Sequence, residues 1–191
     1  MLKFKALALS TLAAGLLFGM QSAHVQPGKS SLTEVSKGSR SFPIPKPMEV
    51  EHKELHSALA QLTKAGGRTG EAAQTVAQLL DRHFIKENEY ALPPLSLLVP
   101  LSQGKFECNM TEVLQLTDKL EGDMPTMLSE HKDITAALIK LKDAATSENK
   151  PAGVRFAEHL AAHAQTEEQI TYPTALLIGL YVKSRATQCA R

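Results

Sequence analysis

The sequence predicts an all-α protein, an up-down-up-down four-helix bundle built from two duplicated helical hairpins. Apolar residues recur at helical spacing in four segments, and strand signals are few. Short connections at 66–70 and about 146–150 join the segments in pairs, as in antiparallel hairpins. The motif His-x-x-x-Glu occurs at 83–87 and again at 163–167, so the second half of the chain repeats the first.

The four predicted helices follow in order along the chain. The first covers about 48–65 and ends at a Gly-Gly pair, a common C-terminal stop. The second begins near residue 69. The third covers about 111–145, with a kink expected at Pro125. The fourth runs over about 151–183 and starts with a proline, which favours the first turn.

A longer connection, at 94–110, joins the two hairpins. Its apolar stretch at 95–101 either extends the second helix or covers the end of the bundle.

The N-terminus has the pattern of a secretory signal peptide. Lys3 and Lys5 precede an apolar run that is short for a membrane span, and small residues follow at Ser22 and Ala23. We expect a signal peptide at 1–23, a flexible tether at 24–47 and the bundle at 48–191. The protein is then exported, periplasmic or secreted, without stable membrane insertion after cleavage. An uncleaved anchor is the alternative.

Composition narrows the class of protein. A chain of 191 residues with 43% hydrophobic residues can bury one well-packed domain. The 21 basic and 20 acidic residues nearly balance, so nothing indicates a nucleic-acid partner. Two cysteines are too few for a four-cysteine metal site. Cys108 precedes the third helix and Cys189 follows the fourth, so we expect a disulfide at the end opposite the hairpin turns, with two unpaired thiols as the alternative.

The repeated histidines and glutamates should meet in one layer of the core. His52 and His83 lie at equal distances from the first hairpin turn, about 20 Å at 1.5 Å per residue. The second hairpin places its two histidines at about the same depth. Each glutamate follows its histidine by one turn and points inward. The predicted metal ligands are His52, His83, Glu87, His131, His163 and Glu167.

Such a layer requires compensation, because burying unpaired charges is costly. Imidazole and carboxylate ligands without thiolate suit iron, manganese or zinc. Six ligands are too many for one tetrahedral zinc but divide into two metals with two bridging carboxylates. The alternative is a hydrogen-bonded His–Glu network in a metal-free structural bundle.

These motifs resemble the hemerythrin-like (HHE cation-binding) family over about 48–183. The matching residues are Glu51-His52, His83-x-x-x-Glu87, Glu130-His131 and His163-x-x-x-Glu167 followed by Glu168. The resemblance implies a non-haem di-iron centre, two iron ions bridged by carboxylates and an oxo or hydroxo group. It also implies dioxygen, or a small anion or oxidant, as the partner. Oxygen-carrying members have a further histidine where this chain has Thr135.

Three more residues are candidate ligands or neighbours of the centre. His56, one turn after His52, is a possible fifth imidazole. Glu168 is an alternative to Glu167 as bridge, but Glu167 reproduces the spacing of the first repeat. His159 shares a face with the fourth-helix ligand, although its repeat equivalent is Leu79.

The number of imidazoles bears on function. With His56 bound, one coordination position stays open, which suits a reversible oxygen binder; without it, two stay open, which suits a sensor or a redox enzyme. We expect an oxygen- or oxidant-binding protein rather than an enzyme, with a redox enzyme acting on peroxide or nitric oxide as the alternative. For Tyr90 and Tyr172 we expect packing roles; a place in the surroundings of the centre is the alternative.

Overall fold

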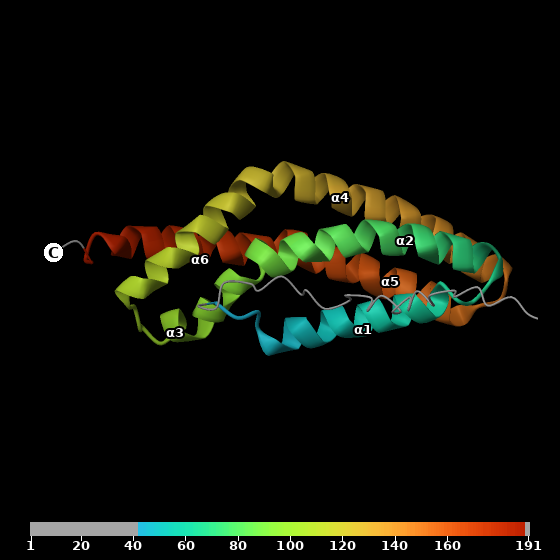
Figure 1. The fold of residues 1–191 in the computed structure, drawn as a ribbon, viewed down its shortest axis with the longest axis horizontal. Helices are drawn as coiled ribbons and strands as arrows, with labels where there is room; N and C mark the ends of the chain where they lie inside the picture. Colours follow the sequence, from blue (N-terminus) through green and yellow to red (C-terminus); the bar gives the residue numbers. More distant parts are fainter. Residues whose placement is uncertain (1–41, 190–191) are drawn as a thin grey trace, which may run out of the picture. The chain divides into compact units, whose positions relative to one another are not determined.

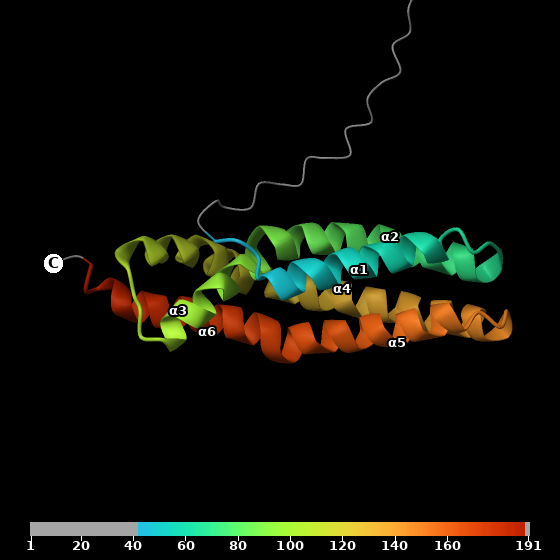
Figure 2. The same ribbon diagram turned by 90° about the horizontal axis from the view of Figure 1, so that it is seen from below.

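The structure is a computed structural model that describes residues 42–189. Four helices form the bundle: α1 (Lys46–Leu62), α2 (Gly67–Lys86), α4 (Val113–Ser147) and α5 (Pro151–Thr166). Figures 1 and 2 show them side by side, with both hairpin turns at the same end. The described part of the chain contains no strand. The predicted all-α bundle of two hairpins is therefore confirmed.

The structured chain starts earlier than the expected boundary at residue 48. The predicted signal peptide, and the tether as far as residue 41, lie outside the described residues. Phe42, however, is buried in the core, and Ile44 packs against it. α1 already begins at Lys46, after Pro45. The sequence does not indicate this earlier start, because the prolines at 43, 45 and 47 interrupt the helical spacing of the apolar residues there.

The second and fourth predicted helices each contain a π-helical turn. α2 continues into the π turn η1 (Glu87–Ala91), and α5 continues through the π turn η4 (Glu167–Thr171) into α6 (Tyr172–Ala186). Both π turns begin at a glutamate of the predicted metal layer. Such turns are rare and occur frequently at functional sites.

The connection between the hairpins covers the end of the bundle. It forms two short helices, η2 (Pro93–Leu97) and α3 (Leu98–Ser102). Leu95 and Leu97 are buried in the same core cluster as Val113 and Val182. A further 3-10 turn, η3 (Cys108–Glu112), leads into α4.

α4 is the longest described helix and carries Pro125 in its interior. Figure 1 shows that this helix bends along its length. An interior proline removes one backbone hydrogen bond and displaces the preceding turn, which accounts for a bend.

A disulfide joins Cys108 to Cys189, with the two Cα atoms 5.6 Å apart. It links the start of η3 to the turn that follows α6, at the end of the bundle away from the hairpin turns. No helix among residues 42–189 has the length and apolar character needed to cross a membrane.

The two hairpin turns are fastened to each other by Glu148. Its carboxylate accepts hydrogen bonds from the backbone N–H groups of Arg68 (2.8 Å) and Thr69 (3.1 Å), and so caps the N-terminus of α2. Contacts with Lys150 and Thr69 lower the pKa of Glu148 to about 2. Gly67, at φ 63°, allows this approach, because a Cβ there would lie 2.6 Å from the carboxylate.

Two apolar clusters fill the core. One lies in the half with the hairpin turns and includes Leu59, Ile134 and Leu160. The other lies in the half with α6 and includes Leu92 and Met127. The buried histidines and glutamates belong to neither cluster, and they occupy the layer between them.

Candidate metal centre

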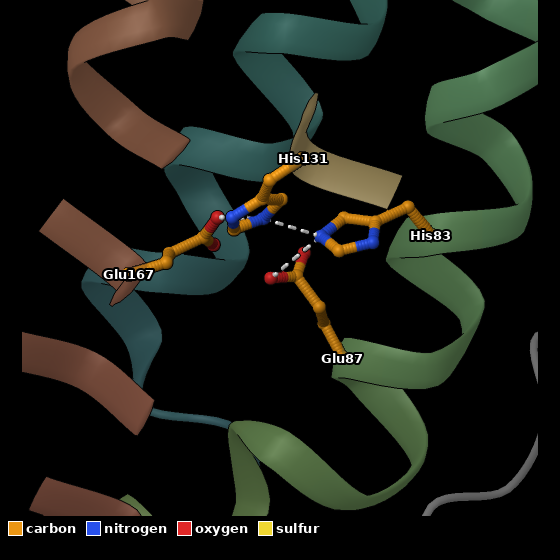
Figure 3. Close-up of side chains that lie close together, drawn as sticks. All are labelled: His83, Glu87, His131 and Glu167. Carbon is orange, nitrogen blue, oxygen red and sulfur yellow. Dashed lines mark hydrogen bonds and ion pairs between the residues drawn. The ribbon is translucent and has the colours of Figure 1, made fainter. Parts of the chain in front are cut away.

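The first part of the centre lies between α2 and α4. Figure 3 shows His83, Glu87, His131 and Glu167 pointing toward one another. The Nε2 atoms of His83 and His131 are 2.8 Å apart. Glu87 Oε1 lies 3.4 Å from His83 Nε2, and Glu167 Oε2 lies 3.4 Å from His131 Nε2. All four residues are buried, and their ligand atoms are close enough together to surround one metal ion.

The second part lies between α1 and α5. His163 Nε2 is 2.9 Å from Glu167 Oε1. His52 Nε2 is 3.6 Å from Glu87 Oε2 and 3.7 Å from Glu167 Oε1. His52, His163 and Glu167 form a second group that could hold an ion. Each group thus combines one histidine from each hairpin.

Both glutamates connect the two groups. Glu87 directs Oε1 toward His83 and Oε2 toward His52. Glu167 directs Oε2 toward His131 and Oε1 toward His163. Their side chains are 0% and 2% exposed, so water cannot take the place of these contacts. Two carboxylates with one oxygen at each of two sites have the arrangement of bridging ligands.

Three of the four histidines have a carboxylate behind the ring. His83 Nδ1 contacts Glu130 at 2.9 Å, and His131 Nδ1 contacts Glu168 at 2.9 Å. His163 Nδ1 contacts Glu51 at 3.1 Å. A carboxylate on Nδ1 fixes the ring orientation and leaves Nε2 free to bind metal. Glu51 and Glu130 each serve a histidine of the opposite hairpin, so they also hold the two hairpins in register.

His52 is the exception. Its Nδ1 has no hydrogen-bond partner. The repeat explains the difference, because Asn88 stands in the first half where Glu168 stands in the second. The ring of His52 instead stacks on Phe84, with centroids 3.9 Å apart and planes 1° apart. Packing therefore orients this ring without a charged partner.

The charges in this layer depend on one another. Burial opposes a charge on His83, but the nearby Glu87 carboxylate outweighs it and raises the pKa of His83 to about 9. Burial likewise opposes a charge on His163, but the Glu167 carboxylate outweighs it and raises the pKa of His163 to about 9. Burial and the charge of Glu167 raise the pKa of Glu87. Glu167 is buried too, but close contacts with the His131, His163 and His52 rings hold its pKa well below the usual range.

Buried side-chain atoms that lack a hydrogen-bond partner show whether this layer suits metal ions. Five buried atoms without hydrogen bonds belong to this layer: His52 Nδ1, His52 Nε2, His163 Nε2, Glu87 Oε2 and Glu167 Oε1. Four of them are the ligand atoms that surround the His52–His163 position. Leaving a buried polar atom unsatisfied costs about 1–3 kcal/mol. A cation at that position would satisfy all four, so the residues fit a metal ion.

The six predicted ligands meet in the layer, whereas two of the additional candidates do not. The His56 side chain is 45% exposed and lies 3.5 Å from Asp81. The His159 side chain is 58% exposed and lies 3.8 Å from Glu51. Glu168 lies behind His131 instead of between the two groups. Glu167 is thus the glutamate that faces both groups.

Tyr172, for which the sequence favours a packing role over a place near the centre, lies at the centre. The Tyr172 hydroxyl donates to Glu87 Oε1 at 2.6 Å, and its side chain is fully buried. The π turn causes this placement. The backbone N–H of Tyr172 bonds to the carbonyl of Glu167, five residues earlier, so both residues fall on one face. A regular helical period does not reveal it.

Comparison with known proteins agrees with the geometry. A family model described as the hemerythrin HHE cation-binding domain matches residues 44–175, more than half of the chain. No curated protein and no solved structure gave a match. The matched range contains every residue of the layer. The chain therefore belongs to the hemerythrin HHE cation-binding family.

Proposed function

We propose that this protein binds two iron ions in the buried layer and binds dioxygen or a related small oxidant there. One observation carries the proposal: Glu87 and Glu167 each present one oxygen to the His83–His131 group and the other to the His52–His163 group. The family is a cation-binding one, and imidazole with carboxylate is a ligand set that suits iron.

The protein's own residues give the centre its properties. Four histidines and two bridging carboxylates would hold the two iron ions, with an oxo or hydroxo group as a further bridge. Glu130, Glu168 and Glu51 orient three of the imidazoles through Nδ1. Burial of the layer excludes bulk water. A bound iron pair would supply redox chemistry and open coordination positions to a small ligand.

Metal binding in this layer is coupled to proton release. His83 and His163 have a pKa of about 9, so both carry a proton near neutral pH in the metal-free protein. A metal ion can bind only after Nε2 has lost its proton. Iron affinity should therefore increase as the pH rises toward 9.

A redox enzyme acting on peroxide or nitric oxide is the second candidate, and the position of His56 favours it. Because His56 lies at the surface, four histidines and two bridging carboxylates, with a one-atom bridge, leave a position open on each six-coordinate iron. Open positions on both ions, if no further residue fills one of them, would allow a substrate to be activated as well as bound.

We also propose that the protein is exported, periplasmic or secreted. The apolar N-terminal segment that follows two lysines supports this location. The Cys108–Cys189 disulfide supports it as well, because such bonds persist in oxidising compartments.

An optical experiment separates the two functions. The iron-loaded protein is reduced without oxygen, exposed to air and reduced again, with spectra recorded at each step. A reversible spectral change over several cycles supports oxygen binding. Catalytic loss of added peroxide or nitric oxide, at many turnovers for each protein, supports the enzyme. A protein that binds no iron contradicts both.

A further inference from the structure

The Tyr172 hydroxyl lies among the metal-facing atoms of the His83–His131 group. It is 2.6 Å from Glu87 Oε1, 3.2 Å from His83 Nε2 and 3.3 Å from His131 Nε2. The side chain is 0% exposed, and its ring stacks on that of His131. Three neighbouring atoms of this hydroxyl are therefore ligand atoms of the same metal position.

These separations match those between ligands of one ion. Ligand atoms about 2.1 Å from a metal, at right angles to each other, are about 3 Å apart. Glu87 Oε1, His83 Nε2 and His131 Nε2 lie 2.6–3.3 Å from the hydroxyl oxygen. The hydroxyl oxygen thus lies where a fourth ligand of the same ion would lie, beside the three ligand atoms Glu87 Oε1, His83 Nε2 and His131 Nε2.

Among residues 42–189, no such hydroxyl lies at the other metal position. The repeat equivalent of Tyr172 is Leu92, which is buried in the apolar core. Near the His52–His163 position the aromatic neighbour is Phe84, which offers no oxygen. The duplication has therefore produced two positions with different surroundings.

We propose that Tyr172 is a metal ligand, whose phenolate oxygen binds the ion held by His83 and His131. The inference rests on the proposed di-iron centre and deepens it. On binding, the phenol proton leaves to solvent with the protons displaced from the histidines. The charge of a bound ferric ion favours this loss, as it does for other coordinating groups.

The assignment determines where a small oxidant binds. Two histidines, two carboxylate oxygens and a bridging atom give each iron five ligands, and Tyr172 supplies the sixth to the ion of the His83–His131 group. The ion held by His52 and His163 then keeps the single open position.

The chain offers a matched control for this proposal. It contains three tyrosines. Tyr90 is buried like Tyr172, but its hydroxyl donates to Asp123 and lies outside the centre. Tyr181 is 40% exposed. Tyr172→Phe and Tyr90→Phe each remove one buried hydroxyl and keep the ring, so they differ only in the position of the lost oxygen.

The experiment uses ferric-loaded full-length protein. We expect a visible phenolate-to-iron charge-transfer band and resonance Raman tyrosinate modes in the wild type and in Tyr90→Phe. Tyr172→Phe should lose both signals while it keeps two irons. Wild type grown with ring-deuterated tyrosine should show shifted Raman modes, which tests the ligand without a substitution. Azide titration should give one bound azide in the wild type and a second in Tyr172→Phe.

Three results would overturn the inference. Two bound irons in the wild type without tyrosinate modes would show that Tyr172 stays protonated, and the proposed di-iron centre would survive. Tyrosinate modes that persist in Tyr172→Phe would assign the ligand to another tyrosine. A wild type that binds no iron would overturn the inference and the proposed function together, so the two failures are distinguishable.

Discussion

The metal-free protein should lose stability as the pH rises from 6.5 to 9. The pKa of His83 and of His163 is about 9 in the folded protein, against an ordinary value of 6.5. A pKa raised on folding means that the native state holds more protons than the unfolded chain in this window. The stabilisation is therefore fully present below pH 6.5 and is lost as the pH rises through 9.

The expected effect is large enough to measure. One pKa unit corresponds to about 1.4 kcal/mol, so the shift of each histidine is worth about 3 kcal/mol. The total stability of a small domain is about 5–15 kcal/mol. The two histidines together should therefore remove a substantial part of the free energy of unfolding.

Urea unfolding of chelator-treated protein, followed by circular dichroism between pH 6 and pH 9.5, measures this loss. The midpoint should fall steadily across the window. His83→Gln should show about half of the pH dependence of the wild type. His56→Gln, at an exposed histidine, should keep all of it. A wild-type midpoint that stays constant or rises between pH 6.5 and 9 would refute the reasoning.

Three further predictions concern the ion pairs, the packing and the disulfide. Glu168→Gln should weaken binding of one iron by about 10–100-fold in chelator competition, because the carboxylate behind an imidazole is lost; an unchanged affinity would contradict this role. Gly179→Ala should destabilise the protein by about 1–3 kcal/mol in urea, because a Cβ there would lie 2.5 Å from Thr117 Oγ1. Gly122→Ala, which meets nothing within 4 Å, should not destabilise it. Cys108→Ser should lower the free energy of unfolding by about 4 kcal/mol, because the disulfide closes a long loop and so restricts the unfolded chain. The iron content should stay unchanged, and free thiols in the oxidised wild type would contradict the bond.

The fold and the main residues of the centre were accessible from the sequence because the chain repeats itself. Duplicated His-x-x-x-Glu motifs at equal depth in two hairpins place their side chains in one layer whatever the details of packing. The pairing of the histidines was not accessible in this way. His83 pairs with His131 and His52 with His163 because α2 packs on α4 and α1 packs on α5.

The features that the sequence concealed depend on departures from regular helix. The π turns at Glu87 and Glu167 rotate the residues that follow them, which brings Tyr172 onto the centre. The cap that Glu148 provides to α2 joins two segments far apart in the chain. The carboxylate partners of the histidines are half-exposed glutamates, which resemble ordinary surface residues in a sequence.

The central claim is that two metal ions are held in one layer by two bridging glutamates, and iron analysis of purified protein tests it most directly. We predict two irons for each wild-type chain. Glu87→Ala should lose at least one of them, while Glu89→Ala, whose side chain is 47% exposed and contacts Lys119, should keep both. No bound iron in the wild type, or two irons in Glu87→Ala, would contradict the claim.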